Sequence, residues 1–223
     1  MTNDRMAVLS AMMEQGVIPV FHHADADVCR SVIAACANGG ATCVEFTNRG
    51  DFAAHTFLDL ARHFGAADPR VVLGAGSVVD APTAGLYIAN GARFVVGPLL
   101  NPDVAKVCNR RKVAYIPGCG TLSEIGDAEE LGCEIVKIFP GNAVGGPDFV
   151  KSVLAPCPWT RIMPTGGVDC SEASLRAWFD AGVACVGIGS QLITKALLEA
   201  KDYAGIERKV RDTVQLVKTI RGR

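Results

Sequence analysis

Two charged residues lie within otherwise apolar stretches of this 223-residue sequence. Lys137 stands in the run Ile135–Phe139, and Glu45 stands in the run Cys43–Thr47. A charged group is costly in a packed strand unless it is paired or loses its charge. Burial lowers the pKa of a lysine, and the neutral amine is the form that attacks a ketone. The two residues therefore predict a nucleophilic lysine and a carboxylate that moves protons.

A structural role is the alternative for each of these residues. Lys137 alone would also fit a lysine that reaches out of the sheet or pairs with a buried acid. Together, Lys137 and Glu45 would fit a buried ion pair, which costs desolvation of both charges for little stability. Such charges are more often found where catalysis needs a perturbed pKa. We therefore interpret both residues as catalytic, on nonadjacent strands that face each other across a barrel mouth.

Two glycine-containing segments favour a bound phosphate. Gly166 and Gly167 follow one apolar run, and Gly189 ends the next run with Ser190 directly after it. Backbone N–H groups in such loops hold anions, and the loops after strands 7 and 8 are the usual phosphate position in eight-stranded α/β barrels. Either segment alone would be a weak signal, because glycines also simply turn the chain.

Three further polar residues follow predicted strands. Arg49 is suited to a bidentate grip on a substrate carboxylate, with a solvated loop arginine as the alternative. Ser77 is interpreted as holding a substrate oxygen, or else as capping the next helix. His22 and His23 end the first strand, and alternation does not decide which of them faces the mouth. Position favours His22, and a polar residue that merely ends the strand is its alternative.

Eight short apolar runs alternate with helical segments, which predicts parallel strands joined by helices. Eight such units without a long excursion favour a single (β/α)8 TIM barrel spanning residues 1–223 over an open doubly wound sheet. An amphipathic helix is expected before the first strand, over residues 1–16. The runs are Val17–Phe21, Cys43–Thr47, Val71–Ala75, Phe94–Gly97, Ala114–Pro117, Ile135–Phe139, Arg161–Thr165 and Cys185–Gly189.

Helix boundaries carry recognisable signals. Asp80 and Asn101 each stand before a proline-containing helix start, and Thr121 with Glu124 has the reciprocal capping pattern. Four helix ends lead through a glycine straight into a strand, where a left-handed residue is expected. These glycines are Gly40, Gly91, Gly132 and Gly182, at intervals of 51, 41 and 50 residues.

Composition excludes several classes of protein. The net charge is −1 without a basic run, so we expect no nucleic-acid partner. No stretch approaches a membrane-spanning length, so no membrane partner is expected. The nine cysteines form no CxxC pair and no Cys/His cluster at metal spacing. Several of them sit in apolar runs as small hydrophobes, which indicates a reducing cytoplasm.

The segments VEFTNRG, GAGS, VKIFPG, PTGGV and GIGS together resemble the bacterial 2-keto-3-deoxy-6-phosphogluconate aldolases, which also act on 4-hydroxy-2-oxoglutarate. The resemblance runs from about Val17 to Ser190. It implies that Lys137 forms a Schiff base and that Glu45 is the general acid/base. It also implies that Arg49 and the Ser77 hydroxyl, which is a threonine in many members, hold the pyruvyl carboxylate.

The resemblance further matches Gly166, Gly167, Gly189 and Ser190 to the phosphate cradle. Thr165, in the segment PTGGV, is expected to be a further substrate-binding residue. Some members carry an arginine where this sequence has His22, which bears on substrate preference. A homotrimer is implied by the resemblance alone.

The function expected is a class I aldol cleavage that yields pyruvate and an aldehyde without a metal or organic cofactor. The first alternative is a sugar-phosphate isomerase or epimerase barrel that uses Glu45 as its base. The second is a non-catalytic barrel that binds a phosphate ligand, although such a protein has no need of buried charges.

Overall fold

The computed structural model describes residues 4–222, and helices alternate with strands along this part of the chain. The helices are α1 (Arg5–Gln15), α2 (Ala26–Asn38), α3 (Ala53–Ala67), α4 (Ala81–Ala89), α5 (Pro102–Arg111), α6 (Leu122–Glu130), α7 (Gly146–Leu154), α8 (Glu172–Asp180), α9 (Lys195–Glu199) and α10 (Tyr203–Ile220). The strands are β1 (Val17–Phe21), β2 (Cys43–Thr47), β3 (Val72–Gly76), β4 (Phe94–Val96), β5 (Ala114–Ile116), β6 (Gly118–Cys119), β7 (Val136–Ile138), β8 (Ile162–Pro164) and β9 (Val186–Ile188).

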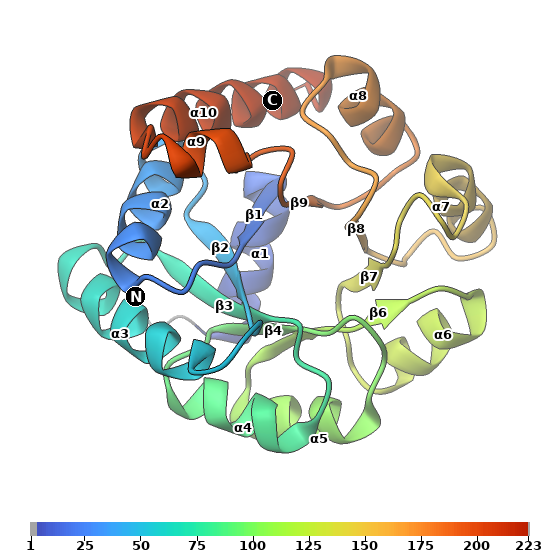
Figure 1. Cartoon of the computed structure of the whole chain (residues 1–223). Helices are drawn as coiled ribbons and strands as arrows, with labels where there is room; N and C mark the ends of the chain where they lie inside the picture. Colours follow the sequence, from blue (N-terminus) through green and yellow to red (C-terminus); the bar gives the residue numbers. More distant parts are fainter. Residues whose placement is uncertain (1–3, 223) are drawn as a thin grey trace.

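The strands pair in parallel, as predicted. One sheet has the order β5-β4-β3-β2-β1-β9, and a second sheet has the order β6-β7-β8. Only Pro117 separates β5 from β6, and Thr165 after β8 bridges Gly187 of β9. The protein is therefore an α/β fold with a curled parallel sheet, and the helices encircle its strands (Figure 1).

The predicted strand over Ala114–Pro117 is shorter than expected. It ends at Ile116, and β6 begins at Gly118. Proline has no N–H group to donate to a strand ladder. The carbonyl of Pro117 still accepts from the N–H of Lys137 at 2.8 Å, so the chain continues beside β7 after this interruption. Residues 4–222 consequently contain nine strands, one more than the eight predicted.

The buried side chains form two layers, one inside the curled sheet and one between the sheet and the helices. Strand alternation divides them, since Ile135 of the β7 segment belongs to the inner layer whereas Val136 and Ile138 belong to the outer one. The inner layer takes side chains from most of the strands and from α1. Its members are Val8, Leu9, Met12, Ile18, Cys43, Val72, Phe94, Val96, Ala114, Ile116, Ile135, Met163 and Cys185.

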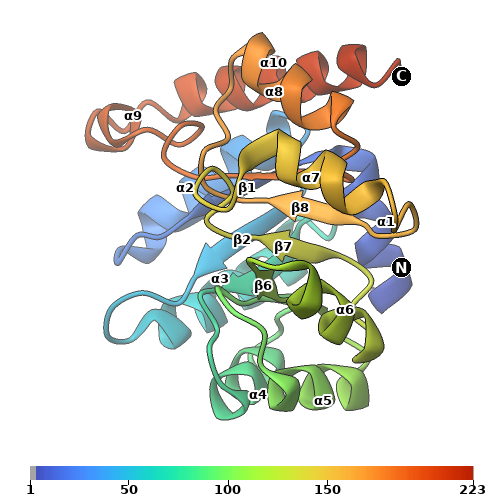
Figure 2. The ribbon, with the colours of Figure 1, turned by 90° about the vertical axis from the view of Figure 1, so that its right-hand side faces the viewer.

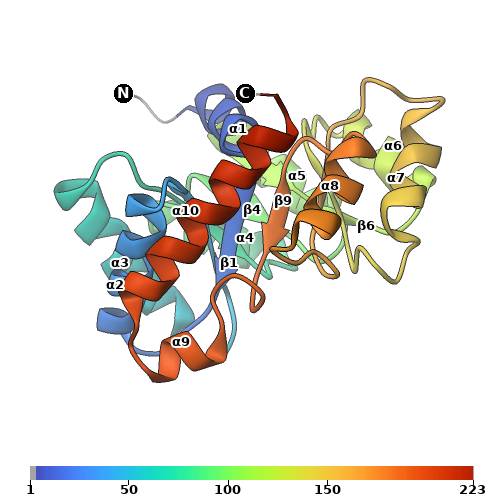
Figure 3. The same cartoon turned by 90° about the horizontal axis from the view of Figure 1, so that it is seen from above.

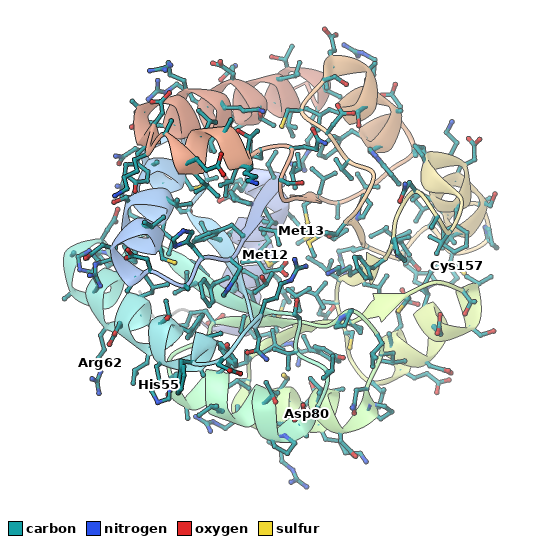
Figure 4. All side chains as sticks on the ribbon, viewed as in Figure 1. Met12, Met13, His55, Arg62, Asp80 and Cys157 are labelled. Atoms are coloured by element: carbon teal, nitrogen blue, oxygen red, sulfur yellow. The ribbon has the colours of Figure 1, made fainter. Side chains whose placement is uncertain are left out.

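The predicted N-terminal helix is present as α1, and it covers the amino ends of the strands. Met12 is fully buried and lies near the middle of the ring of strands (Figure 4). Gln15 fixes the helix to the sheet, because its side chain donates to the carbonyl of Cys43 and accepts from the N–H of Cys43. α9 lies at the opposite end of the strands from α1 (Figures 2 and 3), on the side of their carboxyl ends.

The predicted helix boundaries are confirmed. Asp80, Asn101 and Thr121 cap α4, α5 and α6 by accepting from N–H groups of the first turn. All four junction glycines have a positive φ, between 78° at Gly132 and 102° at Gly91. The alternative role of Ser77 as a helix cap is wrong, because Asp80 caps the helix that follows it.

Candidate active site

A cleft of about 670 Å³ opens at the carboxyl ends of the strands. Residues after β1, β2, β8 and β9 line it, because the carboxyl ends of parallel strands meet at one edge. Most of the predicted site residues are among them, namely His22, Arg49, Thr165, Gly166, Gly167, Gly189 and Ser190. Sequence positions as far apart as 22 and 190 therefore share one cleft.

Lys137 and Glu45 lie below this cleft, inside the curled sheet. The exposed fraction is 5% for Lys137 and 1% for Glu45. Lys137 belongs to β7 and Glu45 to β2, and these strands are not neighbours in either sheet. The ammonium nitrogen of Lys137 stands 4.6 Å from the centre of the Phe139 ring, and Phe139 in turn lines the cleft. Phe139 thus connects the buried amine to the opening above it.

The buried environment shifts the two groups in opposite directions. Burial raises the pKa of Glu45, while the positive charges of Lys137 and Arg49 act against this shift. Burial also lowers the pKa of Lys137, with Arg49 adding to the effect and Glu45 opposing it. Both shifts favour the uncharged forms, because a low-dielectric interior penalises a charge. An amine held in this way is available as a nucleophile nearer to neutral pH than a surface lysine.

Several buried polar atoms at the site have no hydrogen-bond partner in the structure. They are Nδ1 of His22, Oε2 of Glu45 and Oγ1 of Thr165. Buried polar groups in folded proteins are nearly always satisfied, so each exception needs an explanation. The fourth such atom over residues 4–222 is Oγ1 of Thr160, which lies away from the cleft. Their concentration at one place indicates a site for a polar ligand.

The structure distinguishes the two histidines after β1. His22 lines the cleft, whereas Nδ1 of His23 accepts from the N–H of Asp25 at 3.0 Å and so belongs to the turn before α2. The ring centre of His22 lies 5.5 Å from that of Phe46. Burial lowers the pKa of His22, and Arg49 and His23 add to the effect, while a hydrogen bond to the backbone of Thr47 opposes it. His22 is therefore the histidine at the mouth, and its neutral form is favoured.

The glycines after β8 are needed for two different reasons. Gly166 and Gly167 have φ values of 84° and 79°, which few other residues adopt. A Cβ atom at Gly167 would also lie 2.4 Å from Cβ of Asn142. Gly189, in contrast, has open space around it, since the nearest atom to a Cβ there is the carbonyl oxygen of Val20 at 3.5 Å. A side chain at Gly189 would consequently intrude only on the cleft.

Ser77 and Arg49 occupy less central positions. Arg49 is exposed at the cleft, and its charge acts on Glu45, Lys137 and His22. Ser77 follows β3 directly, is partly buried and has a positive φ of 59°. It is not one of the residues that line the cleft. Seven of the ten predicted site residues therefore line the cleft, Lys137 and Glu45 are buried below it, and Ser77 is not among the lining residues.

Sequence reasoning missed Asp169, Gln191 and Lys195, which also line the cleft. Each of them follows a glycine-containing segment that had been singled out, so a search of the next few residues would have found them. Lys195 begins α9 and lies 3.5 Å from Glu199. It is a second basic side chain in the cleft besides Arg49.

Within residues 4–222, His, Cys, Asp and Glu side chains form no group of three that could hold a metal ion. None of the helices over the same residues is long and apolar enough to cross a membrane.

The fold and the site together define a class of protein. A curled parallel sheet that buries a lysine opposite a carboxylate, below a glycine-rich cleft, is typical of an α/β enzyme that uses an amine nucleophile. The family model described as KDPG and KHG aldolase matches residues 8–209. The chain therefore belongs to this aldolase family and is a carbon–carbon lyase.

Individual relatives agree with this assignment. The chain is 31% identical over 211 residues to a 2-dehydro-3-deoxy-phosphogluconate aldolase of Haemophilus influenzae, covering 95% of this chain and 97% of the relative. It is 29% identical to the KHG/KDPG aldolase of Escherichia coli K12, covering 96% and 98%. A crystal structure of KDPG aldolase from Legionella pneumophila, with pyruvate captured as a covalent carbinolamine, has a TM-score of 0.83 and 25% identity, covering 92% of this chain and 96% of that one.

Proposed function

We propose that this protein cleaves 2-keto-3-deoxy-6-phosphogluconate, 4-hydroxy-2-oxoglutarate or a related 2-keto-3-deoxy acid into pyruvate and an aldehyde, through a Schiff base on Lys137. The observation that carries the proposal is the buried amine of Lys137, whose pKa is lowered by burial, in the same interior as the Glu45 carboxyl group. The family assignment and the names of the relatives support the substrate class.

Lys137 adds to the C2 ketone of the substrate as a neutral amine. The carboxyl group of Glu45 donates the proton with which the carbinolamine loses water, which leaves a protonated imine on Lys137 and a carboxylate at Glu45. This cation accepts the electron pair of the C3–C4 bond when the bond breaks, while Glu45 takes the proton of the C4 hydroxyl group. The aldehyde leaves, and Glu45 returns a proton to C3 of the enamine. Hydrolysis of the resulting imine releases pyruvate and restores the amine of Lys137.

The remaining predicted residues would hold the substrate. Arg49 at the cleft mouth is suited to the pyruvyl carboxylate, with the hydroxyl groups of Ser77 and Thr165 as further partners. The unsatisfied Oγ1 of Thr165 supports its part in this set. The backbone of Gly166, Gly167 and Gly189 and the hydroxyl group of Ser190 would cradle a phosphate, with Lys195 as a nearby positive charge. His22 follows β1, which lies in the sheet between β2, the strand before Arg49, and β9, the strand before Ser190.

The alternatives use the same residues differently. An isomerase or epimerase would employ Glu45 as a base without a covalent bond to Lys137, and a binding protein would employ neither. Membership of an aldolase family favours neither alternative. Steady-state rates of pyruvate release from a panel of 2-keto-3-deoxy acids, with and without phosphate, test the proposal. Release of pyruvate from at least one acid is expected, and isomerisation without release would contradict the proposal.

We further propose that the strands close into one eight-stranded barrel that forms a single domain over residues 1–223. In this account β5 and β6 are two parts of one strand interrupted by Pro117. The bridge between Thr165 and Gly187, and the N–H of Ala184 that donates to the carbonyl of Ile162 at 2.9 Å, support pairing between β8 and β9. Slow hydrogen exchange at the amides of Ala184 and Lys137 would be the sign of closure on both sides.

A homotrimer is the oligomeric state that we propose. Large apolar side chains are exposed near the carboxyl ends of β2, β3 and β4 and on the helices beside them, and an interface would bury them. They are Phe52 (77% exposed), Val79 (46%), Leu86 (50%), Leu99 (46%) and Leu122 (47%). Light scattering should give three times the chain mass of 23.4 kDa, and a monomer would contradict this proposal.

A cytoplasmic location is proposed because all nine cysteines are free thiols.

A further inference from the structure

Strand β3 carries two glycines, Gly74 and Gly76, on the face that looks into the curled sheet. Gly74 pairs with Glu45 and Gly76 pairs with Thr47 on the neighbouring strand. Neither glycine has a positive φ, so the backbone conformation does not require the absence of a side chain. A different reason must account for two glycines at alternate positions of a buried strand, where glycine is unfavourable.

The reason is the space that each glycine leaves for another side chain. A Cβ atom at Gly74 would lie 2.2 Å from Cε2 of Phe94, whose ring fills the inner layer of the core. A Cβ atom at Gly76 would lie 1.9 Å from Oε1 and 2.6 Å from Cδ of Glu45. Carbon atoms in folded proteins do not approach that closely. Gly74 thus makes room for an aromatic ring, whereas Gly76 makes room for the carboxyl group of Glu45.

The space above Gly76 also determines the position of the Glu45 carboxyl group. The carboxyl group is buried, and its Oε2 has no hydrogen-bond partner. The charged groups that act on it are Lys137 and Arg49, yet none of the ion pairs found within 4.0 Å over residues 4–222 joins it to either. A methyl group on β3 would displace the carboxyl group from that strand into the interior, where Lys137 is also buried.

We infer that Gly76 is a positioning residue, which keeps the carboxyl group of Glu45 beside β3 and apart from Lys137 so that the amine stays free to attack the substrate. This inference rests on the proposed Schiff-base function. Without the space at Gly76, Glu45 would pair with Lys137 and both groups would be withdrawn from the reaction. The nucleophile would then be held as an ammonium ion.

The test is Gly76→Ala, compared with Gly126→Ala as the matched control. Gly126 lies within helix α6 and has no atom within 4 Å of a Cβ added there, so the same methyl group meets nothing. Gly76→Ala should lower kcat by about 10- to 100-fold, the usual cost of a catalytic group displaced by roughly an ångström. The pH at which pyruvate and borohydride trap half of Lys137 should rise by about one unit, because a nearby carboxylate favours the ammonium form. Gly126→Ala should change neither value.

A shorter carboxylate provides the second arm of the test. Glu45→Asp removes one methylene group and withdraws the carboxyl group from Gly76. The double variant Gly76→Ala/Glu45→Asp should therefore lose less activity than the product of the two single losses, and it should unfold at a higher temperature than Gly76→Ala. If Gly76→Ala does not fold at all, recovery of folded protein in the double variant supports the inference, and continued failure to fold overturns it.

Normal kcat and an unchanged trapping pH in folded Gly76→Ala would overturn the inference while leaving the proposed function intact. Strictly multiplicative losses in the double variant would overturn it as well. A wild-type protein that forms no pyruvate adduct would contradict the proposed function instead. In that case the unfolding temperatures of the three variants still decide whether Gly76 accommodates the Glu45 carboxyl group.

Discussion

Glu45 on β2 and Lys137 on β7 occupy the same buried interior, although their strands are not paired with each other. Apart from burial, each is the first charged group that acts on the other's pKa, and each opposes the shift that burial produces. The carboxyl group remains without a hydrogen bond at Oε2. This relationship separates the pair from a structural ion pair, in which both partners would be fully satisfied.

Replacing Glu45, the proposed general acid/base, should preserve the fold but greatly reduce the catalytic rate. Glu45→Gln keeps the shape of the side chain and should lower kcat by roughly 10²–10⁴-fold, as expected when a positioned general acid/base is lost. Exchange of the methyl protons of pyruvate with solvent, followed by NMR, should slow in parallel. Near-normal turnover in a folded variant would remove Glu45 from the mechanism.

Replacing both buried charges should stabilise the protein. The double variant Lys137→Met/Glu45→Gln should be inactive, and its free energy of unfolding should exceed that of the wild type by about 1–4 kcal/mol at pH 7. The raised pKa of Glu45 means that the folded state loses stability as pH rises above 4.5, the usual value of the carboxyl group. The advantage of the double variant should therefore shrink below pH 4.5. Urea unfolding of both proteins across this range is the measurement, and a less stable double variant would contradict the account.

The fold was predictable from the sequence wherever one local signal determined the structure. The four junction glycines and the caps Asp80, Asn101 and Thr121 were each predicted and are confirmed, because a left-handed turn or a first-turn N–H group accepts few residue types. The break at Pro117 was missed, since its effect depends on whether the neighbouring strand needs an N–H group at that position. The arrangement of the two sheets likewise depends on which distant strands pair with each other, and the hydrophobic periodicity of the sequence does not predict this pairing.

The site was predictable to a similar extent. Lys137 and Glu45 stood out because a charge within an apolar strand is rare, and both prove to be buried. Sequence alone did not decide between His22 and His23, because that choice depends on the hydrogen bond between His23 and Asp25. The role of Gly76 could not be predicted either. It depends on how close a Cβ atom at this position would come to the side chain of Glu45 on the neighbouring strand, and the sequence does not contain that distance.

The phosphate cradle is best tested at Gly189. Substitution of Gly167 would strain the backbone and collide with Asn142, so a loss there would not report on phosphate. Gly189→Ala places a methyl group in the open cleft and should raise KM for 2-keto-3-deoxy-6-phosphogluconate about tenfold, with a smaller effect on 4-hydroxy-2-oxoglutarate. Gly126→Ala serves as the control in the same assay. Equal losses on both substrates would show that Gly189 is not a phosphate contact.

His22 should act as a neutral group at physiological pH. Since its pKa is lowered from 6.5, the part of the kcat/KM profile that depends on His22 should lie below pH 6.5 and be flat from pH 7 to 8. His22→Arg adds a permanent charge to the cleft and should lower KM for the phosphorylated substrate by about 3–10-fold at pH 7.5. His23→Arg, outside the cleft, is the control. A wild-type transition at or above pH 6.5, absent from His22→Arg, would contradict this assignment.

Lys137 is the nucleophile of the proposed mechanism, and covalent trapping tests this role most directly. The protein is incubated with pyruvate and sodium borohydride, digested and analysed by mass spectrometry, with Lys137→Met and the exposed Lys195→Met treated in parallel. A reduced pyruvyl adduct is expected on Lys137, and its formation should abolish activity. The adduct should appear equally in Lys195→Met and in the presence of EDTA, and it should be absent from Lys137→Met. An adduct on another lysine, or activity that survives borohydride and disappears with EDTA, would contradict this role of Lys137.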